Sequence, residues 1–401
     1  MIAEDADLTI LNETLNFYKL YQHCMGRSEV PPIFHYWCCV SMIAAILEDR
    51  VYFDFYKDRP IFPNLFIMLL GPSGGCKGLA ISEAVDLVDR TSSVVVNKYR
   101  GSITAPRLVD KLGGRIEKKD DQSCVIDDAK LWLVMDELAN DVGAGGPIMV
   151  RGFLTMMTEL YTGHYVFETG TRMHGDVTVD NACVNWLPGT TKAWLKKVLT
   201  KDMVDSGFTP RVLPVVSDYA PERIRWPEYP DDRDLVYDHL KARLFALRCL
   251  KGRFDITSKA DAVYSKWYLG RTEPDEIMLP FWHRQRVLMF KLAMIFSAMD
   301  AGPLVINSNH VSRAIYWVKQ ANVWHEELVE SASSTVESDD VKIVRAEVQK
   351  AGELTRSELL RKLYRQKILK DRLNRAMGDL LQREEVVQGW QGKAITYKWK
   401  G

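Results

Sequence analysis

Apolar residues in the first half of the chain gather in short unbroken runs. Five such runs occupy residues 64–70, 92–97, 131–136, 183–191 and 211–216. An apolar run without alternating polar positions is typical of a strand covered on both faces, as in a parallel sheet. Stretches with helical periodicity separate the runs, at 103–112, 151–163 and 191–200. Strands that alternate with helices predict an α/β fold with a parallel sheet.

Helical patterns dominate the two sides of this α/β segment. Residues 11–47 read as helices, and RVYFDFY at 50–56 alternates like a half-buried strand. A segment rich in proline and charge, 220–234, reads as a linker and precedes four further helical stretches. We therefore expect a mainly helical region before the α/β segment and another after it along the chain.

The end of the chain has a different order of elements. A small polar stretch at 331–340 reads as a second linker. Three helical patterns follow, and then two short strand patterns at 385–390 and 394–400. A helix, a helix-turn-helix and a β-hairpin make the order of a winged helix.

Composition and charge narrow the class of protein. The chain is formally neutral, but residues 352–401 contain twelve Lys and Arg against six Asp and Glu, which leaves −6 on the rest. A basic end on an acidic body suggests an appendage that binds a polyanion. The seven cysteines form no C-x-x-C pair, and the sequence shows no signal-like or membrane-spanning run. These features predict a reduced cytoplasmic location, bacterial or host, and no membrane partner. The eight histidines show no metal-binding spacing.

The run at 64–70 leads into a turn that resembles a phosphate loop. A buried strand, a glycine turn and a helix start place backbone N–H groups where phosphate oxygens bind. Compared with G-x-x-x-x-G-K-[ST], Cys76 replaces the second glycine and Gly78 replaces the hydroxyl residue. A glycine-serine turn with a chance lysine is the alternative. The residues expected to hold the nucleotide are Gly71, Pro72, Ser73, Gly74, Gly75, Cys76, Lys77, Gly78 and Leu79.

Polar residues at other strand ends predict the rest of the site. Asp136 and Glu137 end the run at 131–136, so Asp136 is expected to hold Mg²⁺ through water and Glu137 to activate the attacking water. The next run presents Asn185 or Thr190 beside the γ-phosphate. Arg211 begins the last run, where it could reach the ATP of a neighbouring subunit. The alternatives are an ordinary acidic strand end and a surface arginine with an acidic partner.

The order of these motifs is similar to that of a family of AAA-plus ATPases from phages, plasmids and integrated elements, which is related to replicative DNA helicases. The resemblance covers most of residues 29–328 and includes PSGGCKGLA, LWLVMDELAN and SGFTPRVLPVV. In that family the loop often reads P-S-G-x-x-K-G-T-A, so Gly78 fits the pattern. Leu79 departs from it, because a hydroxyl residue commonly sits there.

The resemblance implies a domain plan and further residues. The plan is an N-terminal helical region at 1–58, an AAA-plus nucleotide-binding core at 59–220, a helical lid at 221–335 and a winged-helix domain at 340–401. The lid would carry a second arginine that touches the γ-phosphate, in cis or in trans. Arg284 and Arg286 are the candidates, and either could instead extend from a core helix to the surface.

The winged helix would contact DNA phosphates through its recognition helix and wing. The residues expected at that surface are Lys370, Arg372, Arg375, Lys393 and Lys398. A basic face on a protein-docking module is the alternative.

Together these patterns predict an ATP- and Mg²⁺-dependent DNA helicase or translocase that acts as a ring, expected to be a hexamer, in the replication of a mobile element. A primase or polymerase is a candidate partner. The alternative is a nucleotide-dependent initiator or helicase loader that binds DNA without unwinding it. A small-molecule kinase is a weaker third reading, because a kinase needs neither lid nor winged tail.

Overall fold

The structure is a computed structural model, and it forms two compact units, Met1–Glu326 and Glu327–Gly401. The regions expected at 1–58, 59–220 and most of 221–335 belong to one unit. The residues that the structure describes are 17–57, 59–112, 115–119, 122–126, 129–143, 146–162, 167–171, 175–179, 181–198, 207–218, 223–300, 302–336, 339–364, 368, 370–382, 384–392 and 394–400.

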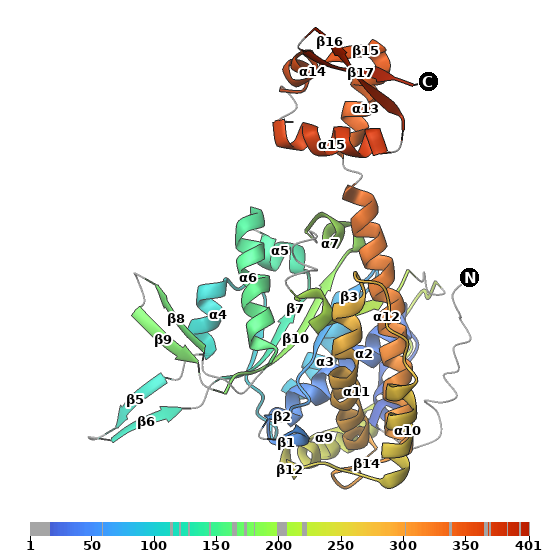
Figure 1. Ribbon diagram of the computed structural model, residues 1–401. Coiled ribbons are helices and arrows are strands. Elements are labelled where there is room, and N and C mark those ends of the chain that lie inside the picture. Colours follow the sequence, from blue (N-terminus) through green and yellow to red (C-terminus); the bar gives the residue numbers. More distant parts are fainter. Residues whose placement is uncertain are drawn as a thin grey trace. The chain divides into compact units, whose positions relative to one another are not determined.

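A five-stranded sheet forms the centre of the first unit, in the order β11-β3-β10-β7-β4. Every neighbouring pair is parallel, which confirms the predicted α/β class (Figure 1). The strands are β3 (Phe66–Leu70), β4 (Lys98–Arg100), β7 (Lys130–Met135), β10 (Cys183–Thr190) and β11 (Val212–Val216). All side chains of β3 and β10 are buried, which explains their unbroken apolar runs.

One predicted strand is wrong in position. The apolar run at 92–97 is not a strand, and β4 begins directly after it at Lys98. Val94 is buried but Val95 is 74% exposed, so the run does not enter the sheet interior.

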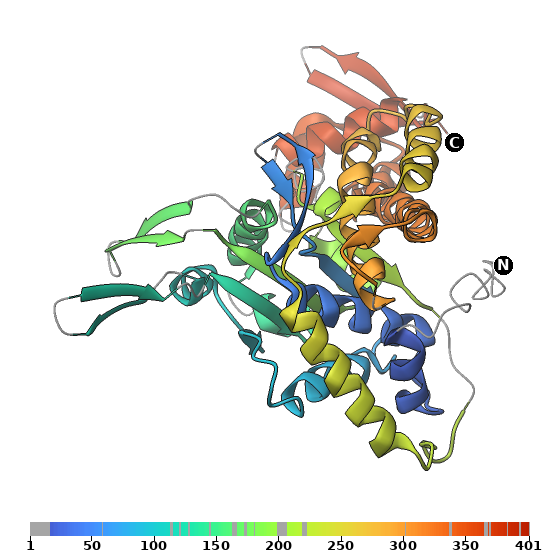
Figure 2. The same ribbon diagram turned by 90° about the horizontal axis from the view of Figure 1, so that it is seen from below.

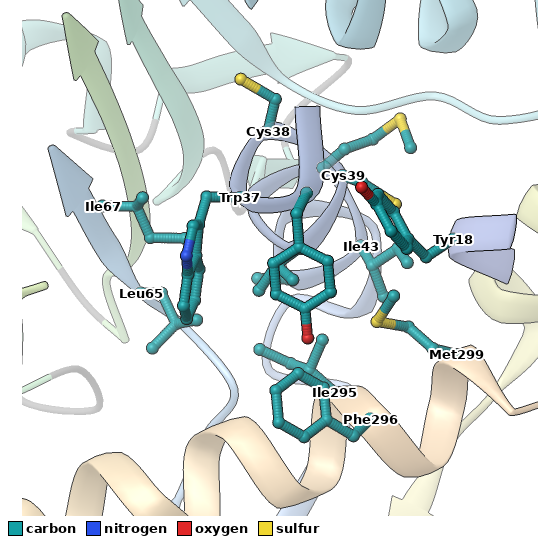
Figure 3. Packing of buried hydrophobic residues seen from close by; sticks show 14 of the residues in the cluster. Tyr18, Trp37, Cys38, Cys39, Ile43, Leu65, Ile67, Ile295, Phe296 and Met299 are labelled. Carbon is teal, nitrogen blue, oxygen red and sulfur yellow. The ribbon is translucent and has the colours of Figure 1, made fainter. Parts of the chain in front are cut away.

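Helices cover both faces of the sheet. On one face, α2 (Pro32–Leu47) packs on the strands, and Trp132 of β7 donates its indole N–H to Ser41 of α2 at 3.1 Å. On the other face, Phe153 of α6 (Gly146–Leu160) meets Trp186 of β10, with ring centroids 6.0 Å apart. Figure 3 shows Trp37 of α2 close to Leu65 and to Ile67 of β3. Because α2 is enclosed by the sheet and other helices, it is apolar on every side.

The expected helical lid packs on the same core. Its helices are α9 (Arg233–Cys249), α10 (Ser258–Leu269), α11 (Leu279–Met299) and α12 (Ser308–Val336). Ile295 and Phe296 of α11 lie beside α2 in Figure 3. The helix α1 (Phe17–Met25) completes this layer. Helix α12 runs through most of the expected linker at 331–340, because that stretch contains no glycine or proline to end a helix.

Two β-hairpins were not predicted from the sequence. One joins β5 (Arg115–Lys119) to β6 (Gln122–Ile126), and the other joins β8 (Phe167–Thr171) to β9 (Gly175–Val179). Figures 1 and 2 show both extending from the same side of the first unit. Their sequences are mostly polar, because neither hairpin belongs to the central sheet. A further short hairpin pairs β1 (Val51–Tyr56) with β2 (Arg59–Ile61).

The second unit has the order of elements that the sequence predicts, with one added strand. It contains α13 (Asp339–Ala351), β15 (Glu353–Thr355), α14 (Arg356–Leu363), α15 (Lys370–Gln382), β16 (Val386–Gln391) and β17 (Ala394–Trp399). The strands form an antiparallel sheet in the order β15-β17-β16. Thr355 and Glu358 form a reciprocal capping box that starts α14.

Among the described residues, no helix has the length and apolar composition that crossing a bilayer requires.

Candidate functional site

A glycine-rich loop connects the end of β3 to α3 (Lys77–Asp89) at the carboxyl edge of the sheet. Gly71 is closely packed, because a Cβ there would lie 3.0 Å from the Ser217 carbonyl oxygen and 3.1 Å from the Phe34 ring. Gly74 has φ +77°, and its neighbours Pro72 and Ser73 are exposed. The loop therefore turns tightly against the sheet and presents its outer side to solvent.

Cys76 adopts the left-handed conformation that glycine normally supplies. Its φ and ψ are 55° and 19°, and it is the N-cap residue of α3. A side chain in this region costs roughly 1–2 kcal/mol relative to the right-handed region. The strained position therefore coincides with the place where the sequence departs from the phosphate-loop pattern.

Lys77 turns its ammonium group back onto the loop. Nζ donates to the carbonyl oxygens of Gly71 at 3.1 Å and Pro72 at 2.7 Å, and the residue is only 5% exposed. Burial lowers the pKa of Lys77, while the nearby Glu137 carboxylate opposes that shift. These carbonyl acceptors are neutral, so they offset the free-energy cost of burying the ammonium charge less than an anion would. Binding of an anion beside Nζ is therefore favourable.

Glu137 is the second residue after the end of β7, and Thr190 ends the neighbouring strand β10. The Thr190 hydroxyl donates to Glu137 Oε1 at 3.3 Å. Gly189 allows this approach, because a Cβ there would lie 2.8 Å from the Asp136 carbonyl oxygen. Lys77, Glu137 and Thr190 therefore meet at one edge of the sheet, as parallel strands allow.

Of the two residues expected beside the γ-phosphate, the structure brings Thr190 to this edge and not Asn185. Asn185 is 1% exposed and lies in the body of β10. Its Oδ1 accepts the Leu65 N–H at 2.9 Å, and its Nδ2 donates to the Ala44 carbonyl at 3.4 Å. Asn185 therefore satisfies buried backbone groups, and the sequence pattern did not distinguish it from the strand-end residue.

Asp136 is held by a residue that the sequence reading missed. Arg100, the last residue of β4, donates from Nε to Asp136 Oδ2 and from Nη2 to Asp136 Oδ1, both at 2.9 Å. The same Nη2 donates to Ser82 Oγ at 2.6 Å, and Ser82 in turn donates to the Gly78 carbonyl at 2.8 Å. The only sequence signal was an arginine shortly after an apolar run.

The donor set near Asp136 does not match the requirements of Mg²⁺. That ion prefers several oxygen ligands, including carboxylates not already neutralised by a cation. Here Asp136 is paired with Arg100, Gly78 has no side chain, and Leu79 is apolar and 45% exposed. In the described ranges no three His, Cys, Asp or Glu side chains group in a way that could hold a metal. The expectation that Asp136 holds Mg²⁺ through water is therefore not supported by its surroundings.

Arg211 and Arg284 lie together at the opposite, amino edge of the sheet. Arg211 precedes β11 and donates to the Gly207 carbonyl at 2.6 Å. A Cβ on Gly207 would be 2.7 Å from Nη1 of Arg211 and 3.8 Å from Nη2 of Arg284. Burial, and then the charge of Arg284, lower the pKa of Arg211 to about 10. Five strand residues, about 16 Å, separate this pair from the loop edge, so neither arginine reaches the phosphate loop of its own chain.

Arg286 is not part of that pair. Its guanidinium donates to the hydroxyls of Tyr56 at 2.7 Å and Tyr268 at 3.2 Å. It also lies over the Phe55 ring, 5.3 Å from the centroid. Arg286 therefore connects α11 to β1 and α10, and its placement fits the alternative structural role.

The basic residues expected on the second unit are partly accounted for. Lys370 and Arg372 at the start of α15 are exposed, as is Lys398 on β17. The side chain of Arg375 and the whole of Lys393 lie outside the described residues.

A scan against protein-family models gives no match, and a search of curated proteins gives no relative. What the site can do therefore follows from its geometry.

Proposed function

We propose that this chain is a ring-forming ATPase with an AAA-plus core and a C-terminal winged helix, which uses ATP to move or open DNA in the replication of a mobile element. One observation carries the proposal. The buried ammonium of Lys77 sits in a glycine loop at the carboxyl edge of a parallel sheet, beside Glu137. This is the edge at which open parallel sheets bind ligands.

In this proposal the loop from Gly71 to Leu79 holds the ATP phosphates through backbone N–H groups and the α3 N-terminus. Lys77 leaves the loop carbonyls and binds a phosphate oxygen. Glu137 accepts a proton from the attacking water. Thr190, which donates to Glu137, orients the carboxylate toward that water.

The position of Arg211 and Arg284 supports a ring. Two partly buried guanidinium groups at the amino edge repel each other, and each has a lowered pKa because of burial. An anion placed between them relieves this repulsion. The γ-phosphate bound at the carboxyl edge of an adjacent subunit is such an anion, so ATP would lie between subunits. A hexamer is the ring size we propose.

The second unit is proposed to bind DNA as a winged helix. The strand order β15-β17-β16, with α14 and α15 before the β16–β17 hairpin, supports this reading. Exposed Lys370, Arg372 and Lys398 would contact phosphates and carry little sequence specificity. A primase or polymerase remains a proposed partner.

A second function is favoured by a specific observation. Asp136 is engaged by Arg100, and neither Gly78 nor Leu79 offers a hydroxyl to a metal. A site of this kind suits slow hydrolysis, as in a nucleotide-dependent initiator or helicase loader that binds DNA without unwinding it.

The deciding experiment compares ATP binding by the wild-type chain and Lys77→Ala. We expect the variant to lose measurable binding, because the loop loses its phosphate-facing cation. Lys241→Ala is the matched control, since that lysine pairs with Asp238 on the surface of α9. Unchanged ATP affinity in a folded Lys77→Ala chain would contradict the site assignment. If the assignment holds, an ATPase assay with and without single-stranded DNA distinguishes a motor from a loader.

A further inference from the structure

Arg100 occupies a central place beside the phosphate loop. Its guanidinium spans two elements, because it binds the Asp136 carboxylate after β7 and the Ser82 hydroxyl on α3. Ser82 bonds the carbonyl of Gly78, one turn earlier on the same helix. These contacts hold the guanidinium near the first turn of α3, where the phosphates of a bound nucleotide would lie.

The Arg100 side chain is also accessible to a ligand. It is 35% exposed, and the Asp136 side chain is 44% exposed. Its Nε and Nη2 make the contacts above, while Nη1 makes no hydrogen bond to any residue that the structure describes. A planar guanidinium anchored through two nitrogens can still offer its third nitrogen to a phosphate oxygen.

The charge balance explains why an arginine suits this position. An aspartate alone at the strand end would repel the phosphates, and in most nucleotide sites a divalent cation removes that repulsion. Here the carboxylate is already neutralised by Arg100, and Gly78 and Leu79 provide no hydroxyl for an ion. The arginine therefore compensates for the hydroxyl that would otherwise help to bind a divalent cation.

We propose that Arg100 is a nucleotide-binding residue: it offsets the negative charge of Asp136 and offers Nη1 to the β- and γ-phosphates beside Lys77, so that ATP binding by this chain does not require a divalent cation. The inference depends on the proposed nucleotide site. It adds that Arg100 and Asp136 act as a unit: Asp136 positions the guanidinium, and Arg100 contacts the phosphates.

The test measures ATP binding at equilibrium, with excess Mg²⁺ and with EDTA, for wild type and four variants, one of which is Lys77→Ala. For wild type we expect dissociation constants within about threefold in the two conditions. For Arg100→Gln we expect ATP affinity in EDTA to fall by at least about tenfold, with Mg²⁺ restoring part of it. Arg100→Lys keeps the charge and should lose less. Lys98→Ala is the matched control, because it removes a cation two residues earlier on β4 that pairs with Asp89.

The outcomes separate this inference from the proposed function. If wild type binds ATP only with Mg²⁺, and Lys77→Ala abolishes that binding, the nucleotide site stands and the role of Arg100 is rejected. The same rejection follows if Arg100→Gln, with an unchanged melting temperature, binds ATP like wild type in EDTA. If wild type binds no ATP in either condition, both proposals fall.

Discussion

The hydroxyl of Thr190 donates to the carboxylate of Glu137 across 3.3 Å and so links the ends of two neighbouring parallel strands. The link fixes one carboxylate oxygen, while Glu137 remains only partly buried and open to a water molecule. Lys77 is close enough for its charge to interact with the same carboxylate. The two residues that we propose as base and as phosphate-binding cation therefore lie close together at this edge of the sheet.

Glu137→Gln should retain ATP and slow its hydrolysis by about 10²–10⁴-fold, because an amide cannot accept a proton from water. Thr190→Val should slow hydrolysis less, since it removes only the group that orients the carboxylate. The measurement is ATP turnover alongside ATP binding. Glu83→Gln serves as control, because Glu83 lies on α3 but pairs with Arg233. Normal turnover in Glu137→Gln would make the acidic pair a structural strand end.

Arg211→Ala and Lys77→Ala should each be inactive alone and should recover some ATPase activity when mixed. Mixed rings contain interfaces in which one chain supplies Lys77 and its neighbour supplies Arg211. The measurement is ATP turnover in rings whose mixed composition is verified by mass. Absence of recovery in such rings would argue against an intersubunit site.

Cys76→Gly should raise the free energy of unfolding by up to about 1 kcal/mol, because glycine adopts φ +55° without steric cost. Cys76→Ala is the matched comparison, since it removes the sulfur and keeps the strained Cβ. We expect that variant to match wild type within about 0.5 kcal/mol. Chemical denaturation measures both. A destabilised Cys76→Gly chain would mean that the thiol contributes more than its conformation costs.

Lys291 should make the stability of the chain depend on pH. It is 3% exposed, and burial lowers its pKa from 10.5 to about 7, while Nζ donates to Asn64 Oδ1 at 2.5 Å. Between these two pKa values the unfolded chain binds more protons than the folded chain, so the free energy of unfolding rises with pH.

Lys291→Met lacks this titration. The stability of wild type relative to the variant should therefore increase between pH 7 and pH 10, by at most about 1.4 kcal/mol per pH unit. Denaturant titrations of both chains across that range give the difference. A difference that stays flat with pH would show that the lysine remains charged when buried.

Lys370→Ala and Lys398→Ala should each weaken DNA binding and reduce its log–log salt slope by roughly 0.7–0.9, the value for one lost phosphate contact. ATPase activity without DNA should not change, because the proposed nucleotide residues all belong to the first unit. Lys362→Ala is a fitting control, since its ammonium lies 3.8 Å from Glu347. If Lys370→Ala and Lys398→Ala bind DNA with the affinity and salt slope of wild type, as the control should, the surface docks a protein instead.

Features that depend on neighbours along the chain could be predicted from the amino-acid sequence. An apolar run, a glycine turn and Lys77 predicted a strand, a loop and a helix start, and β3 and α3 have that form. The alternation of such runs with helical patterns predicted the parallel sheet. These predictions succeed because strand burial and glycine turns are set by a few consecutive residues.

Contacts between residues that are distant in the sequence depend on the tertiary fold. Arg100 and Asp136 are 36 positions apart, and no local pattern marks Arg100 as the partner of that carboxylate. Likewise, the end of a strand could not be told from its middle, so Asn185 and Thr190 were equivalent in sequence although only Thr190 reaches Glu137. Arg211 and Arg284 come together because α11 packs against the short 3-10 helix Thr209–Arg211 that precedes β11. Such meetings depend on strand order and helix packing, which arise from burying many non-local side chains at once and leave no periodic signal along the chain.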